Sequence, residues 1–249
     1  MRIALLVAGA LPDGLPDYHT VFTAFLRDAH ACPFVLDAFD VVHSMAYPTD
    51  EQLGTYDALM YTGSAANAFD DVDWINTLVA FTARVIDSHP ALKLIAICFG
   101  HQIIARALGA SCVRNHRWEV GPTQLTLTPL AQSLFATDSL TIQQMHRDHV
   151  PSLPPSTLPL ASTPTSPIQA FVRFFPSSQS QSLNNVHILS IQGHPEFTEP
   201  IVSHLVSARA KSGIIPPDVA ADYDSRREWP NDGVRILGKA IWAVLGQPN

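Results

Sequence analysis

Cys98 stands where a side chain could act as a nucleophile. Residues 92–97 form a largely apolar run that is typical of a buried strand, and helical periodicity begins soon after Cys98. A sharp strand-to-helix turn would lift the thiol above the sheet edge, and Gly100 lets the two backbones approach closely. Unpaired N–H groups at the start of a helix also favour the thiolate. The pattern indicates nucleophilic chemistry, and the alternative is a small buried side chain.

His194 and Glu196 could supply the base for such a nucleophile. They are two residues apart and directly follow the apolar run 186–191. In an extended segment stiffened by Pro195, this spacing lets the carboxylate reach the imidazole and fix its tautomer and direction. The alternative is an ordinary surface turn. The order of cysteine, histidine and then glutamate differs from that of α/β-hydrolases and of chymotrypsin-type enzymes.

Together the two segments resemble the class I glutamine amidotransferase family. Residues 98–102 (Cys-Phe-Gly-His-Gln) are similar to its nucleophile motif, and residues 192–196 (Gln-Gly-His-Pro-Glu) resemble its His-Pro-Glu motif. The resemblance covers about residues 1 to 200 and is closest to stand-alone members, which are similar to the glutaminase domain of GMP synthase and to plant γ-glutamyl peptidases. It implies that Cys98, His194 and Glu196 form a catalytic triad that hydrolyses γ-glutamyl amides through a thioester.

The resemblance also implies an oxyanion hole made of two backbone amides. One is the amide of Phe99, immediately after the nucleophile. The other is the amide of Ser64, because residues 61–67 are similar to a Ser-Gly-Gly-Pro or Ser-Gly-Ser-Pro turn of the family. Ala65 replaces the proline of that turn, a departure that leaves the donor in place.

Further residues are expected to contact the substrate. Gln102 matches the family glutamine that helps to hold the amino-acid end of the substrate, and residues 117–121 resemble the strand start that borders the γ-glutamyl pocket. Residues 144–150 resemble another family signature, which we expect to order a loop rather than perform chemistry. The expected substrate-binding residues are Gly63, Gly100, Gln102, Trp118 and Glu119.

The elements around these motifs must bring distant segments to one place. Short apolar runs alternate with helical periodicity in the first half, which predicts an α/β fold with a mostly parallel open sheet and helices on both faces. Such sheets place their ligands at the carboxyl ends of the strands. The second half predicts a small antiparallel strand extension. The expected strands are 2–7, 34–42, 57–61, 92–97, 123–128, 140–145, 168–175 and 186–191.

The chain is expected to form one catalytic domain over residues 1–249. Residues 151–167 are rich in proline, serine and threonine, and residues 176–185 are predicted to be a polar, mobile surface loop. Helices are expected near 18–26, 74–85, 101–108 and 201–211, followed by a proline-broken stretch and a last helix over 234–244.

Composition excludes several classes of function. The net charge is −7 without a long basic run, so nucleic acid and membranes are not expected partners. Three scattered cysteines offer no disulfide framework or zinc site, and Cys32 and Cys112 are expected to be packing residues. No secretory signal or membrane-spanning run is found, so a cytoplasmic location is expected. The implied chemistry requires no metal and no cofactor.

The sequence does not determine which amine departs from the γ-glutamyl group. The substrate is a small γ-glutamyl compound, either glutamine or a glutathione-like peptide or conjugate. A glutaminase would supply ammonia to a separate synthetase subunit, because the chain has no P-loop and no room for a fused synthetase domain. A third hypothesis is a non-catalytic interaction or regulatory protein that retains the fold.

Overall fold

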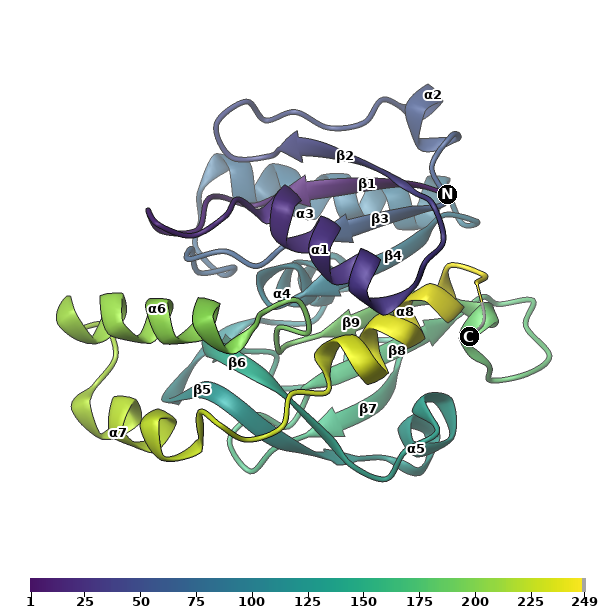
Figure 1. Ribbon diagram of the computed structural model, residues 1–249. Coiled ribbons are helices and arrows are strands. Elements are labelled where there is room, and N and C mark those ends of the chain that lie inside the picture. Colours follow the sequence, from purple (N-terminus) through teal and green to yellow (C-terminus); the bar gives the residue numbers. More distant parts are fainter. Residues whose placement is uncertain (248–249) are drawn as a thin grey trace.

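The strands form one mixed sheet of nine strands in this computed structural model, which describes residues 1–247 (Figure 1). Five strands pair in parallel: β1 (Arg2–Val7), β2 (Val35–Asp40), β3 (Ala58–Tyr61), β4 (Lys93–Ile97) and β9 (Val186–Ile191). Four extend the sheet in antiparallel fashion: β5 (Val113–Leu127), β6 (Leu140–His149), β7 (Leu158–Ser162) and β8 (Ala170–Phe174). The order is β2-β1-β3-β4-β9-β8-β7-β5-β6. The predicted α/β class is confirmed, and the antiparallel part is larger than expected.

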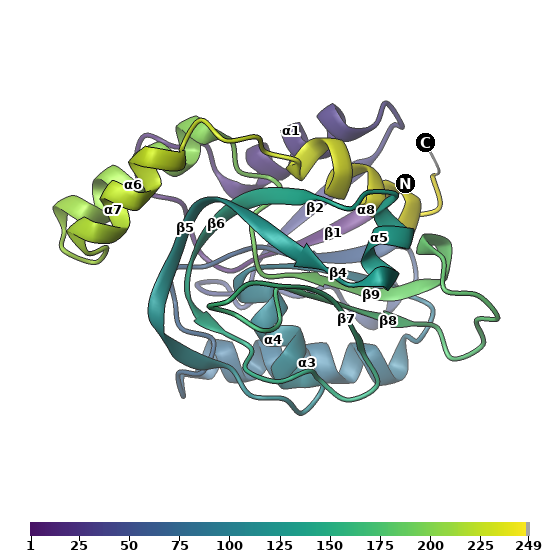
Figure 2. The same cartoon turned by 90° about the horizontal axis from the view of Figure 1, so that it is seen from below.

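Helices cover both faces of the sheet, as Figure 2 shows. One face carries α1 (Tyr18–Ala29) and α8 (Lys239–Val244), and the other carries α3 (Asp73–Ser88) and α4 (Phe99–Ala107). Asp17 caps α1 because its carboxylate accepts the N–H of Thr20 at 2.7 Å. Both faces of β1, β3, β4 and β9 are therefore largely buried, which explains why these strands read as mostly apolar runs, whereas the edge strand β2 is partly exposed.

Alternate residues of β1, β3 and β4 belong to different cores. In β1, Ile3 and Leu5 pack into the core beneath α1, whereas Ala4 and Leu6 pack into the core beneath α3 and α4. Successive side chains of a strand point to opposite faces, so one strand contributes to both layers. This double burial makes the parallel half a rigid base for the loops that leave it.

Three of these strands end at the same level. Tyr61 pairs with Ala96, and Ile97 pairs with Ile191. The chain segments that follow β3, β4 and β9 therefore emerge side by side at the carboxyl edge of the sheet, where open α/β sheets place their ligands. This register brings the three sequence motifs together.

The second half differs from the expected elements at several strands. β5 begins at Val113 instead of 123. Its first half pairs with β6 and shifts register between Arg114 and Glu119. The sequence pattern missed this half because it is polar. β6 continues to His149 instead of ending at 145. β7 lies within the proline-rich segment and was not expected; Pro159 sits next to its register shift, where a missing N–H is tolerated.

Proline also marks two helices that the sequence did not predict. α5 (Pro129–Phe135) and α7 (Pro217–Arg226) each have proline at the first helical position, where the missing N–H has no intrahelical partner anyway. The remaining helical elements are α2 (Asp50–Leu53), α6 (Glu199–Lys211), a 3₁₀ turn at Leu183–Asn185 and a π-helical turn at Gly233–Gly238 that leads into α8. The 3₁₀ turn falls inside the expected loop 176–185.

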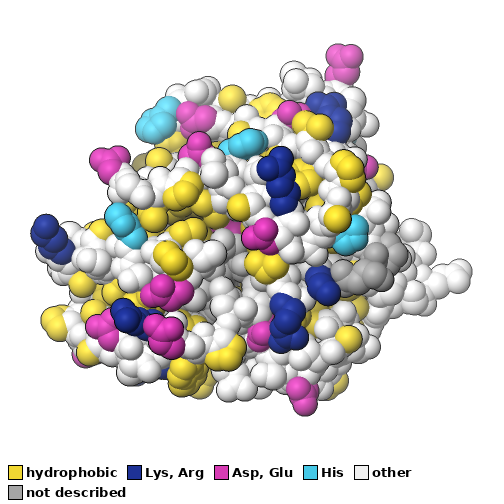
Figure 3. Space-filling view, in the orientation of Figure 1, with side chains coloured by type: hydrophobic (Ala, Val, Ile, Leu, Met, Phe, Trp, Pro, Cys, Tyr) yellow, Lys and Arg dark blue, Asp and Glu magenta, His cyan; other side chains and the backbone are white. Residues whose placement is uncertain are grey.

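Charged side chains of both signs are interspersed over the face of the molecule seen in Figure 3. That face shows no continuous patch of a single charge, although the chain carries a net charge of −7. Within residues 1–247, none of the helices combines the length and the apolar character needed to cross a bilayer.

Candidate active site

Cys98 is the single residue between β4 and α4. Its N–H donates to the carbonyl of Ile191 at 2.8 Å, and its carbonyl accepts the N–H of Gln102 at 3.2 Å. Its φ of 52° lies in the left-handed region, which residues other than glycine rarely adopt. Such strain persists only where the surrounding structure holds it, and it is found mainly at functional sites. The turn leaves the side chain lining a cavity at the sheet edge.

Two glycines allow the close packing around Cys98. A Cβ on Gly100 would lie 2.4 Å from the Cβ of Tyr61, so only glycine lets α4 start against β3. A Cβ on Gly63 would lie 2.7 Å from Cε1 of His194 and 3.6 Å from the Cβ of Cys98. Gly63 thus occupies the place where the cysteine and the imidazole meet, and both glycines serve packing.

Three contacts hold His194 in place, two of them through its imidazole. Its Nδ1 lies 2.8 Å from Oε1 of Glu196, and both side chains are buried. The ring of Phe197 stacks on the imidazole with centroids 4.0 Å apart and an angle of 2° between the planes. The backbone N–H of His194 donates to the carbonyl of Gln143 at 2.8 Å. Fixed in this way, the ring has its other nitrogen available for the Cys98 sulfur.

Charge around His194 favours the imidazolium form. Burial alone would lower the pKa of His194, but the negative charges of Cys98 and Glu196 and their hydrogen bonds outweigh burial and raise the pKa to about 10. The protonated ring would stabilise a thiolate at Cys98. The geometry therefore suits a thiolate–imidazolium pair, which is the reactive form of a cysteine nucleophile.

We predict that His194 is charged in the folded protein up to pH values well above neutral. Because the folded pKa of His194 is raised from 6.5, its contribution to stability is fully present below pH 6.5 and is lost as pH rises through about 10. NMR titration of the imidazole nitrogens should show this high midpoint. In Cys98→Ser the midpoint should fall because the sulfur charge is gone. A wild-type midpoint near 6.5 would contradict the assignment.

The two expected oxyanion donors line the same cavity as Cys98. Phe99 is the first residue of α4, so its N–H has no carbonyl partner within the helix. Ser64 follows β3, and its Oγ accepts the N–H of Ala66 at 3.1 Å. This side-chain turn orders the loop where the family proline is replaced by Ala65.

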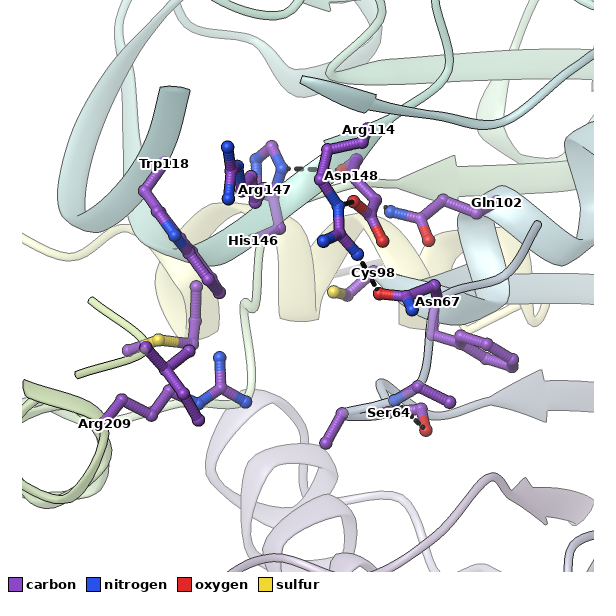
Figure 4. A pocket seen from close by; sticks show the side chains of 15 residues that line it. Ser64, Asn67, Cys98, Gln102, Arg114, Trp118, His146, Arg147, Asp148 and Arg209 are labelled. Carbon is purple, nitrogen blue, oxygen red and sulfur yellow. Dashed lines mark hydrogen bonds and ion pairs between the residues drawn. The ribbon is translucent and has the colours of Figure 1, made fainter. Parts of the chain in front are cut away.

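The cavity beside Cys98, here called the Cys98 cavity, has a volume of about 460 Å³. In Figure 4, Trp118 and Arg209 lie on one side of Cys98, and Gln102 and Asn67 lie on the other. The amide nitrogen of Gln102 donates to the carbonyl of Asp148 at 2.9 Å and to Oε1 of Gln192 at 3.1 Å. Gln102 and Trp118 therefore stand where substrate contact is expected.

Glu119 lies elsewhere than expected. It does not belong to the lining of the Cys98 cavity, and its carboxylate faces a buried polar network. The hydroxyls of Thr163 and Ser166 donate to it at 2.6 Å, and Nε2 of His146 lies 3.3 Å away. Burial raises the pKa of Glu119, but these partners outweigh it and hold the pKa below its usual value. Glu119 is thus placed to position His146, which lines the cavity.

Arg209 was not identified from the sequence. It lies on α6, and its guanidinium is 5.8 Å from the ring centroid of Trp118. Within residues 1–247, no carboxylate forms an ion pair with it, and Figure 4 shows it extending towards Cys98. No motif marks this helix, so only its packing against the sheet edge reveals the residue.

Other reactive side chains are unsuited to chemistry at neutral pH. His101 is fully buried and its Nδ1 lies 2.8 Å from Oγ of Ser190. Burial and the nearby His146 lower the pKa of His101 to about 3, so it stays neutral. Burial raises the pKa of Cys112 to about 12, which disfavours its thiolate. No group of three metal-binding side chains is found in the described part of the chain.

Comparison with known proteins shows which family this chain resembles. A family model described as "Glutamine amidotransferase class-I" matches residues 66–207, which include Cys98, His194 and Glu196. A glutamine amidotransferase-like protein of Schizosaccharomyces pombe is 32% identical over 187 residues, covering 75% of this chain and 71% of that protein.

A peptidase and a solved structure are also similar. Gamma-glutamyl peptidase 4 of Arabidopsis thaliana is 29% identical over 210 residues, covering 82% of this chain and 77% of that protein. The crystal structure of a glutamine amidotransferase from Thermotoga maritima has a TM-score of 0.70 and 16% identity, covering 98% of this chain and 97% of that one. At this identity the likeness concerns the fold alone.

Proposed function

The chain belongs to the class-I glutamine amidotransferase family, and we propose that it hydrolyses γ-glutamyl amide bonds with Cys98 as the nucleophile. The observation that carries the proposal is the imidazole of His194, which is held by Glu196 at 2.8 Å, beside Cys98. The relatives named gamma-glutamyl peptidase support a hydrolase of this kind.

In the proposed mechanism, the Cys98 thiolate attacks the γ-carbonyl carbon and forms a tetrahedral intermediate. The amides of Phe99 and Ser64 donate to its oxyanion. The imidazolium of His194 gives its proton to the departing amine, and a γ-glutamyl thioester remains on Cys98. His194 then takes a proton from water, which attacks the thioester and releases glutamate and the free thiolate.

The polar residues of the Cys98 cavity suit the glutamyl group. Gln102 and Asp148 carry side-chain oxygen atoms that can face an ammonium group, and one oxygen of Asp148 also lies 3.0 Å from Nε of Arg114. Arg209 presents a cation without an ion-pair partner in residues 1–247 to a carboxylate. The α-amino and α-carboxyl groups of a γ-glutamyl substrate carry these charges, so the site is complementary to both of them.

The experiment is incubation of the purified protein with glutamine and with glutathione, followed by measurement of released glutamate and ammonia. We expect glutamate release and labelling of Cys98 by a glutamine-analogue chloroketone. Labelling without turnover of either compound would favour the alternative, a glutaminase that needs a separate synthetase subunit. Neither turnover nor labelling would overturn the proposal and favour a non-catalytic protein that retains the fold.

A further inference from the structure

A second cavity adjoins the Cys98 cavity at the proposed reaction centre. It has a volume of about 340 Å³ and is lined by His194 but not by Cys98, whereas the Cys98 cavity is lined by Cys98 but not by His194. We call it the His194 cavity. The residues that line both cavities mark the boundary between them: Ser64, Ala65, Met145, Arg209 and Ile214.

The chemistry assigns a different part of the substrate to each cavity. The two substituents of the attacked carbonyl carbon, the glutamyl chain and the amide nitrogen, point in different directions from that carbon. The departing nitrogen must lie within hydrogen-bond reach of His194, which protonates it. The amine portion therefore extends into the His194 cavity, and the glutamyl portion occupies the Cys98 cavity.

The size and lining of the His194 cavity suit an occupant much larger than ammonia. A molecule of the size of water takes roughly 30 Å³, and the cavity is about 340 Å³. Its walls are mainly apolar and come from the segment after β1 and from α6, with Leu11, Leu205 and Ala208 among them. Apolar walls with few polar groups bind an apolar group and fix its orientation through the few polar contacts.

We propose that the His194 cavity is a leaving-group subsite for the amine of an amino acid or peptide with an apolar side chain. The apolar walls contact this side chain. Arg209, at the boundary between the two cavities, binds the α-carboxylate of the glutamyl portion. This inference rests on the proposed function, because it concerns the substrate of the same site. It makes the enzyme a peptidase of γ-glutamyl peptides.

The test compares glutamine, γ-glutamylglycine and γ-glutamylleucine as substrates. Burial of the leucine side chain should raise kcat/KM by roughly tenfold or more over glycine, and both peptides should exceed glutamine. In Ala208→Leu the added side chain fills part of the His194 cavity, so the kcat/KM ratio of γ-glutamylleucine to glutamine should fall about tenfold. Ala210→Leu is the matched control on the same helix, because Ala210 lines neither cavity; its ratio should equal that of the wild type.

A second variant keeps the inference testable if Ala208→Leu does not fold. Leu11→Ala removes apolar surface from the opposite wall, so it should lower the preference for leucine over glycine. The inference is overturned if glutamine is the best substrate, or if Ala208→Leu and Ala210→Leu change the ratio equally. Either result leaves the proposed function standing as long as glutamate is released. Absence of all hydrolysis together with an unlabelled Cys98 would instead overturn the proposed function.

Discussion

Cys98→Ala is expected to lower kcat for every γ-glutamyl substrate by roughly four to six orders of magnitude. The substitution removes the sulfur that forms the thioester and leaves only background hydrolysis by the remaining site. Alanine keeps the Cβ, so the unusual backbone conformation of residue 98 costs no more than before. The measurement is steady-state release of glutamate, with circular dichroism and a melting curve to show that the variant is folded.

Cys112→Ala is the matched control for this variant. Cys112 is equally buried, at 5% exposure for each cysteine, and burial raises its pKa to about 12. Its loss should change stability slightly and leave kcat within a factor of about two, since a buried free cysteine serves as a small apolar residue. Turnover that survives in Cys98→Ala would end the assignment of the nucleophile.

Glu196→Gln is expected to lower kcat by roughly 10²- to 10⁴-fold, with a smaller change in KM. The substitution preserves size but removes the negative charge that, together with Cys98, raises the pKa of His194. An amide can also donate to Nδ1 and so select the wrong tautomer of the imidazole. The pH profile of kcat should shift as well, because the imidazolium form is then less favoured.

Glu199→Gln makes the same chemical change three residues further on. Glu199 is half-buried at the start of α6, and the hydroxyl of Tyr223 donates to it at 3.2 Å. This variant should keep kcat and its pH profile, because Glu199 makes no contact with His194 in the described structure. An unchanged kcat in Glu196→Gln would remove Glu196 from the proposed triad.

The parallel half of the fold could be predicted because its signals are local. Residues 2–7 and 92–97 read as buried strands, and both are strands of the sheet. Double burial forces almost every position of such a strand to be apolar, so the pattern is strong. The antiparallel half was harder: the first residues of β5 are polar, and β7 lies in a proline-rich segment.

The sequence by itself determined the family and the α/β class, and it pointed to the three side chains of the proposed triad in their order along the chain. These depend on residue types in short motifs, at Cys98 and at His194 and Glu196. Such motifs can be recognised without knowing which residues they contact in the fold. The family resemblance is confirmed by the match over residues 66–207.

Only the tertiary structure decided which side chains surround the reaction centre. Glu119 lies within residues 117–121, a segment that suggested substrate contact, yet folding turns its carboxylate towards Thr163 and Ser166. Arg209 and Ala208 lie on a helix without any motif, and they line the cavities because α6 packs beside the carboxyl edge of the sheet. Cavity walls form where segments distant in sequence come into contact, and local residue patterns do not predict those contacts.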